Sequence, residues 1–172
     1  ADAAFILLEK FLSRMEREGE YYKMTENLEW SQDDYQAIAS HQYDVRKNPV
    51  TKPLLDNGFT LAEGEGTVFP IPDWDQLHSY FGPRASPAMK AFLNQEATER
   101  NANPWNDGGI AIELNTLADW AAFWEKFNRD NPYFPLNAQT LESERYMRLV
   151  LVNGSDNTPT YNYETLAIED TF

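Results

Sequence analysis

Apolar side chains that recur every three or four residues constrain the fold of this chain more than any other feature. The clearest apolar stripe, within 116–130, contains Leu117, Trp120, Phe123, Trp124 and Phe127. A second stripe, near the N-terminus, contains Phe5, Leu8, Phe11, Leu12 and Met15. Each stripe places one apolar face on an amphipathic helix, so helices are expected to dominate the fold.

Residues that typically begin or end helices separate these segments. The predicted N-caps are Ser31, Asp73, Ser86, Thr116 and Asn137, with Asp119 completing a capping box with Thr116. The predicted helix ends are Gly19, Asn48-Pro49, Gly58 and Gly154, and residues 52–57 are read as a single helical turn. In the last helix, from Asn137 to Gly154, the apolar residues widen toward the end: Leu141, Tyr146, Leu149, Val150 and Val152.

Extended structure is expected in only a few short segments. Residues 68–71 predict a brief extended piece, but Pro70 and Pro72 lack backbone N–H groups and exclude a central strand. Residues 110–116 fit either a short strand or the lead-in to a helix, and the tail after 158 fits a strand or hairpin arm. With no repeat or linker visible, residues 1–172 are predicted to form a single globular domain, mainly α, of about six helices with a few short extended segments.

The size and composition predict a well-formed core. A chain of 172 residues buries about 70% of the surface that its unfolded form exposes, and 42% of these residues are hydrophobic. No run of 18 or more apolar residues occurs, so no membrane span is predicted.

The net charge of −14 limits the partners that this chain can bind. Acidic residues are spread along the chain, and no cluster of Lys and Arg forms a basic patch. Because affinity for phosphate backbones depends on such clusters, nucleic acids and anionic membrane surfaces are not expected as partners.

The chain contains no cysteine, which excludes disulfides, thiol nucleophiles, Fe–S clusters and zinc bound by cysteine. It begins "ADAAF", which fits removal of a leader after a small-residue site. We therefore expect an extracytoplasmic location, secreted or membrane-anchored at the cell envelope, with a lipid anchor upstream of residue 1 as one form of it. A shortened cytosolic protein is the alternative.

The segment "GFTLAEGEGTVFPIPDW", residues 58–74, contains the strongest candidate site. Glu63 and Glu65 fit a pair of catalytic carboxylates or ligand-binding groups, with Trp74 as an apolar wall. In a structural interpretation, Gly64 and Gly66 adopt positive φ angles and a glutamate accepts the backbone N–H groups of a bend.

A second candidate lies in the loop "NPWNDGG". Trp105, beside Asp107, fits an exposed stacking platform for a sugar or peptide, with insertion into the core as the alternative. The predicted ligand-binding residues are therefore Glu63, Glu65, Trp74, Trp105 and Asp107.

Other known site patterns are absent from the sequence. His41 and His78 lie 37 residues apart in no zinc motif, and neither a GxSxG elbow nor a phosphate-binding glycine loop occurs. Residues 153–162 are rich in oxygen ligands, but they lack the EF-hand pattern and are better explained as a turn after a helix end. We assign no catalytic residue, no metal ligand and no cofactor.

Three stretches, "GFTLAEGEGTVFPIPDWDQL", "SPAMKAFLNQEATE" and "DNTPTYNYET", give the chain a family resemblance. Over most of residues 1–165 it resembles uncharacterised bacterial extracytoplasmic, lipoprotein-type helical domains. The resemblance implies a helical fold and a cell-envelope location, and it carries over no catalytic residue.

The sequence thus predicts an exported binding or interaction module of the cell envelope, whose ligand is a small molecule, a glycan or a protein. The alternative is a glycan-cleaving hydrolase that uses Glu63 and Glu65 as its acid and base. A structural or inhibitory partner of another envelope protein is a third interpretation.

Overall fold

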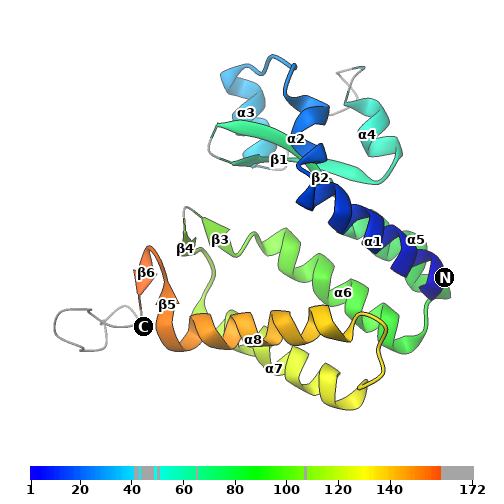
Figure 1. The fold of residues 1–172 in the computed structure, drawn as a ribbon. Helices are drawn as coiled ribbons and strands as arrows, with labels where there is room; N and C mark the ends of the chain where they lie inside the picture. The colour runs from blue at the N-terminus through cyan, green and yellow to red at the C-terminus, as the bar shows by residue number, and fades with distance from the viewer. Residues whose placement is uncertain (41–42, 44–48, 50, 65, 107, 160–172) are drawn as a thin grey trace. The chain divides into compact units, whose positions relative to one another are not determined.

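The computed structural model describes the chain except for residues 41–42, 44–48, 50, 65, 107 and 160–172. Eight α-helices and six short strands lie within the described residues (Figure 1), which confirms the mainly α class with a few short extended segments. The sequence predicted one domain over residues 1–172. The structure divides into two compact units, Ala1–Leu93 and Asn94–Phe172, called unit 1 and unit 2 here.

Unit 1 contains five helices, a short 3₁₀ turn, one hairpin and the beginning of a sixth helix. These elements are α1 (Asp2–Arg17), α2 (Glu20–Thr25), α3 (Gln32–Ala39), α4 (Lys52–Asp56), β1 (Phe59–Gly64), β2 (Thr67–Pro72), α5 (Trp74–Phe81), the 3₁₀ turn Gly82–Arg84 and α6 (Pro87–Ala102). The unit boundary falls inside α6.

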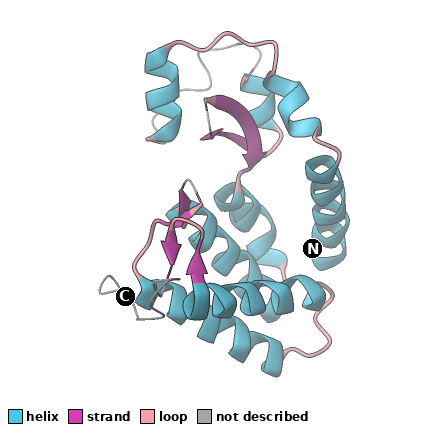
Figure 2. Ribbon diagram, turned by 60° about the vertical axis from the view of Figure 1, so that its left-hand side comes forward, coloured by secondary structure: helices cyan, strands magenta, loops and turns pink. Residues whose placement is uncertain are grey.

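Unit 2 contains the end of α6, two further helices and four two-residue strands. These are β3 (Trp105–Asn106), β4 (Gly109–Ile110), α7 (Leu114–Asp130), α8 (Asn137–Asn153), β5 (Gly154–Ser155) and β6 (Thr158–Pro159). Each pair of strands forms a small antiparallel hairpin (Figure 2).

Several predicted helix starts are confirmed by their hydrogen bonds. The Ser31 side chain accepts from the Asp34 backbone N–H while Asp34 accepts from the Ser31 N–H, which completes a capping box. Asp73 accepts from Gln76 N at 2.9 Å, and Ser86 Oγ accepts from Met89 N at 3.2 Å. These caps satisfy N–H groups that have no partner inside the helix.

Other predicted boundaries are wrong. The helix that begins at Gln32 ends at Ala39, earlier than predicted, and Asn48, where its end was expected, lies outside the described residues. The predicted Thr116 cap lies inside α7, because this helix already begins at Leu114 and the Thr116 N–H donates to the Glu113 carbonyl. Similarly, Asn137 is the first residue of α8 rather than its cap.

The hairpin of β1 and β2 places its two prolines where they disturb no pairing. Phe59 lies opposite Pro72 and Leu61 opposite Pro70, while Asp73 N donates to the Gly58 carbonyl at 2.9 Å. Because hydrogen-bonded and non-hydrogen-bonded pairs alternate in an antiparallel ladder, both prolines occupy non-hydrogen-bonded pairs. Their nitrogens therefore face the outer edge of β2.

The core of unit 1 is built around one phenylalanine. Phe5 of α1 has 0% of its surface exposed, and its ring lies 5.4 Å from that of Phe81, 6.1 Å from that of Phe92 and 6.2 Å from that of Trp74. A second cluster consists of Ile38, Leu61 and Val68, which join α3 to the hairpin. The short helices are thus held by tertiary packing.

Replacing Phe5 by alanine is expected to lower the free energy of unfolding by about 3–5 kcal/mol, because it leaves a cavity among three aromatic rings. Phe11→Ala is the matched control, since Phe11 lies on the same helix with 55% of its surface exposed. The Phe11→Ala substitution should lower the free energy of unfolding by roughly 1 kcal/mol or less. Urea unfolding measures both changes. If the two variants lose the same free energy of unfolding, this description of the core is wrong.

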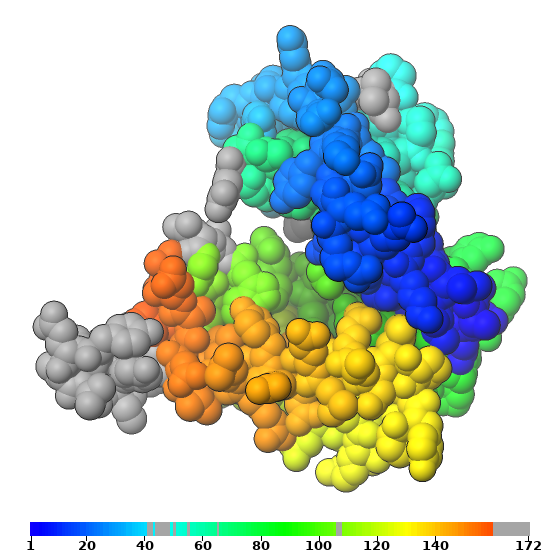
Figure 3. Space-filling model, in the orientation of Figure 1, coloured from blue at the N-terminus to red at the C-terminus, as the bar shows by residue number. Residues whose placement is uncertain are grey.

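The core of unit 2 lies between its helices. The predicted stripe of α7 is confirmed for Leu117, Trp120, Trp124 and Phe127, all of which are buried. On α8 the buried residues are Thr140, Met147 and Val150. Of the apolar residues expected along this helix, four are exposed: Leu141, Tyr146, Leu149 and Val152. In the space-filling view of Figure 3, α8 runs in yellow to orange along the visible surface of unit 2.

A polar network joins α7 to α8. The Thr140 hydroxyl donates to Asn128 Oδ1 at 2.6 Å, and Asn128 Nδ2 donates to Glu144 Oε2 at 2.8 Å. Thr140 is fully buried and Asn128 is 8% exposed, so these groups depend on each other for hydrogen bonds.

Thr140→Val should therefore destabilise the protein by about 1–3 kcal/mol, because the buried Asn128 oxygen loses its donor while the volume hardly changes. Thr98→Val provides the same substitution at an exposed helix position and should change the stability by about 0.5 kcal/mol. Thermal and urea unfolding of both variants measure the difference, and a neutral Thr140→Val would refute the network.

Candidate binding site

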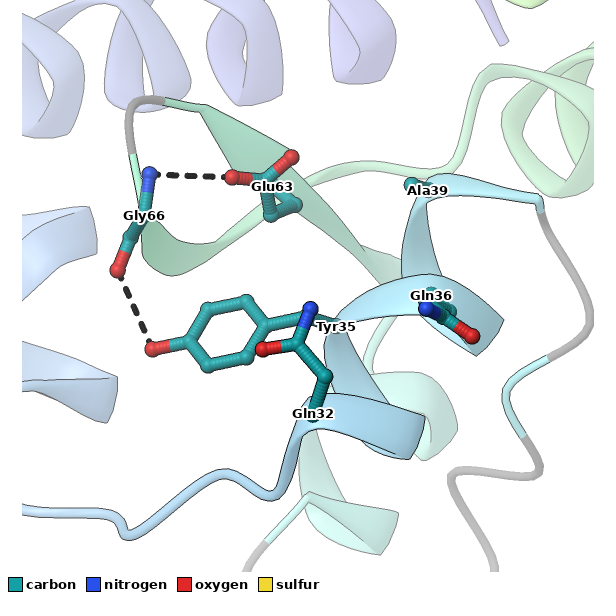
Figure 4. Close-up of a pocket in the computed structure, with 6 residues that line it drawn as sticks. All are labelled: Gln32, Tyr35, Gln36, Ala39, Glu63 and Gly66. Atoms are coloured by element: carbon teal, nitrogen blue, oxygen red, sulfur yellow. Dashed lines mark hydrogen bonds between the residues drawn. The ribbon is translucent and has the colours of Figure 1, made fainter.

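A hollow of about 380 Å³ lies between α3 and the turn of the β1–β2 hairpin (Figure 4). Its lining residues are Gln32, Tyr35, Gln36, Ala39, Glu63 and Gly66. This volume lies within the range of small-molecule sites, although the hollow is open toward solvent.

One face of α3 provides most of the lining. The capping box at Ser31 fixes the start of the helix, so positions 32, 35, 36 and 39 follow at helical spacing and share a face. Beside this face of the same helix, Ile38 packs against Leu61 and Val68 of the hairpin, and Tyr35 partly covers the same cluster. This packing holds α3 beside the turn.

Two hydrogen bonds fix the turn itself. The Gly66 N–H donates to Glu63 Oε1 at 3.0 Å, and the Tyr35 hydroxyl donates to the Gly66 carbonyl at 3.0 Å (Figure 4). Gly66 has a φ of +74°, which side chains other than glycine rarely adopt. The structural interpretation of Glu63 as an acceptor within a bend is thus confirmed.

The positive φ predicted for Gly64 is wrong, since the positive-φ glycines of the described chain do not include it. Gly64 instead ends strand β1 and pairs with Thr67. A Cβ at this position would meet the Phe69 ring at 3.5 Å.

The five predicted ligand-binding residues are placed as follows. Glu63 lines the hollow. Trp74 lies in the core of unit 1 with 7% of its surface exposed, and it does not line the hollow. Glu65 and Asp107 lie outside the described residues. Trp105 belongs to unit 2, where it is half-buried and its ring meets that of Tyr146 edge-to-face at 5.3 Å.

Sequence reasoning missed Gln32, Tyr35 and Gln36. The Ser31 cap and the helical period were enough to place the three on one helix face. Nothing local in the sequence connects that face to Glu63, which lies about 30 positions further along the chain.

The polar groups that line the hollow can form hydrogen bonds with a ligand. Glu63 is its one acidic lining residue among those described, and the amides of Gln32 and Gln36 each provide a donor and an acceptor. Within the described part of the chain, neither amide side chain forms a hydrogen bond. These two exposed amides can therefore bind a ligand without first breaking bonds within the protein.

The described residues contain no group of three or more His, Asp and Glu side chains placed to hold a metal ion. Within the oxygen-rich segment after α8, residues 154–159 form the β5–β6 hairpin, in which the Ser155 and Thr158 hydroxyls lie 2.7 Å apart, and residues 160–162 lie outside the described residues. This agrees with the turn predicted there.

Comparisons of the chain with protein-family models, curated proteins and solved structures find no match. In the described residues, no helix combines the length and the apolar character needed to cross a membrane.

Tyr35→Phe should weaken the turn, because the Gly66 carbonyl loses its hydrogen bond from the phenol. We expect a loss of about 0.5–1.5 kcal/mol in stability and faster amide exchange at Gly66. Tyr133→Phe is the control, since Tyr133 is 96% exposed and should tolerate the change. Unchanged exchange at Gly66 in Tyr35→Phe would show that the phenol does not hold the turn.

Proposed function

We propose that this protein is an exported binding module of the cell envelope, and that the hollow between α3 and the hairpin turn holds its ligand. One observation carries the proposal: the hollow combines the Glu63 carboxylate with two side-chain amides that have no hydrogen-bond partner in the described chain. Sites for small ligands are concave and have a few polar groups that fix orientation.

An uncharged saccharide fits this chemistry best. Sugar hydroxyls both donate and accept, so they can bond with the amides of Gln32 and Gln36 and donate to the second oxygen of Glu63. The Tyr35 ring adds an apolar surface for the C–H groups of a sugar. The net charge of −14 disfavours anionic polysaccharides, so we place neutral glycans first among the ligands.

Two features favour the envelope location. The chain has no cysteine that an oxidising compartment could convert to a disulfide. The resemblance expected from the sequence, to bacterial lipoprotein-type domains, implies the same location. Fractionation of the native organism with an antibody against this protein tests the location separately from binding.

Calorimetric titration with neutral oligosaccharides built from glucose or N-acetylglucosamine tests the ligand class. We expect one of these series to bind. Replacing both Gln32 and Gln36 by alanine should weaken that binding at least about tenfold, because hydrogen bonds worth roughly 1.4 kcal/mol or more are lost. Gln139→Ala, a change of the same kind on α8, should leave the affinity unchanged.

The possible outcomes test the site, the ligand class and the alternative function separately. Binding that survives the double variant refutes this hollow as the site. Absence of binding across both series refutes the ligand class. Release of reducing ends during incubation, lost in Glu63→Gln, would favour the glycan-cleaving hydrolase instead.

A further inference from the structure

Helix α8 has two apolar faces. The inner face includes the buried Met147 and Val150, and this side of the helix packs against α7. The outer face presents Leu141, Leu149 and Val152, whose exposed fractions lie between 47% and 71%. A helix that covers a single neighbour needs only one apolar face. The outer face of α8 is therefore not required for its packing on α7.

The residue spacing along the outer face reads the same from either end. Its exposed residues, called the outer stripe here, are Ala138, Leu141, Arg145, Leu149 and Val152. Successive members are separated by three, four, four and three positions, spacings at which two helices can interlock their side chains. An antiparallel second copy of α8, related by a two-fold axis at Arg145, brings Leu141 opposite Leu149 of that copy. In the same arrangement Ala138 lies opposite Val152, so the stripe is complementary to itself.

The charges on the outer face fit the same arrangement. Arg148 already pairs with Glu125 and Glu144, whereas Arg145 and Glu142 form no ion pair within the described part of the chain. Around a two-fold axis at Arg145, Glu142 of the second copy lies three residues along the helix, or about 4.5 Å, from the level of Arg145. Each Arg145 guanidinium can therefore donate to Glu142 of the other copy. These two ion pairs draw apart the like charges that meet at the axis.

The net charge of α8 also differs from that of the chain. The four charged residues of this helix are Glu142, Glu144, Arg145 and Arg148, which sum to zero, while the whole chain has a net charge of −14. Two copies of so acidic a chain repel each other over most surfaces. A neutral helix with exposed leucines is a surface on which two copies can meet without this repulsion.

We propose that the protein associates with a second copy of itself through the outer stripe of α8, as an antiparallel helix pair around a two-fold axis at Arg145. The contacts of Leu141 with Leu149 exclude water, and the ion pairs of Arg145 with Glu142 fix the register. The stripe is about 21 Å long, so the contact belongs with small interfaces, below about 1,200 Å². Association is accordingly weak and depends on protein concentration.

Sedimentation equilibrium of the whole protein, from about 10 µM to about 1 mM, tests the association. The average mass should rise with concentration from that of one chain toward that of two. Leu149→Glu should raise the dissociation constant at least about tenfold, because it places a charge in the apolar contact twice per dimer. Leu7→Glu is the matched control, since Leu7 of α1 is 70% exposed and lies outside the stripe.

A wild-type mass that stays at one chain over this range overturns the proposal. It is equally overturned if Leu149→Glu associates as tightly as the wild type, or if Leu7→Glu weakens association as much as Leu149→Glu does. Both substitutions are at exposed positions, and urea unfolding checks that the variants are folded. The wild-type measurement needs no variant.

A charge exchange tests the antiparallel register. Arg145→Glu and Glu142→Arg each bring like charges together across the axis, so each variant alone should associate at least about tenfold more weakly than the wild type. An equimolar mixture of the two variants should form a heterodimer at least as tight as the wild-type dimer, because each glutamate then faces an arginine. Failure of the mixture to associate overturns the proposed register. The stripe belongs to unit 2, so none of these results depends on whether the hollow beside Glu63 in unit 1 binds a glycan.

Discussion

Burial of aromatic side chains is the constraint on which this structure depends. Helices α2, α3, α4 and α5 have only five to eight residues each, and helices this short are unstable alone in water. They persist because neighbouring elements cover their apolar faces. In unit 1 the rings of Trp74, Phe81 and Phe92 surround Phe5, and in unit 2 the Phe127 ring meets that of Phe134 at 5.0 Å. Local sequence thus decides where these helices begin, and packing decides whether they exist.

Features determined by neighbouring residues were predictable from the sequence, and features determined by packing were less so. The caps at Ser31 and Asp73 depend on side chains within three positions, and both were identified correctly. The face that α8 buries was harder to recognise, because it includes the polar Thr140 and Glu144 beside Met147. These polar residues are satisfied by Asn128 of α7, a partner that hydrophobic periodicity does not reveal.

The candidate site shows the same division. Glu63 and the bend at Gly66 were recognised from glycine spacing, because the hydrogen bond that holds them spans three residues. The Gln32 and Gln36 side chains line the same hollow as Glu63 only because Ile38 packs on the hairpin, and no short motif encodes this packing. Trp74 was expected at the site because it follows the hairpin closely in sequence. It instead contributes to the aromatic core, where a large ring stabilises more than it would at the surface.

The placement of the hairpin prolines has a consequence for self-association. An isolated two-stranded sheet has two edges, and an exposed edge can template the addition of another chain. Along the outer edge of β2, Pro70 and Pro72 provide no N–H groups, and the Val68 carbonyl already accepts a hydrogen bond from the Thr25 hydroxyl at 2.6 Å. An incoming strand would find few groups to pair with there. Pro70 is also fully buried, so the prolines that obscured this hairpin in the sequence, together with the packing of α2 against β2, leave the β2 edge unsuited to adding a further strand.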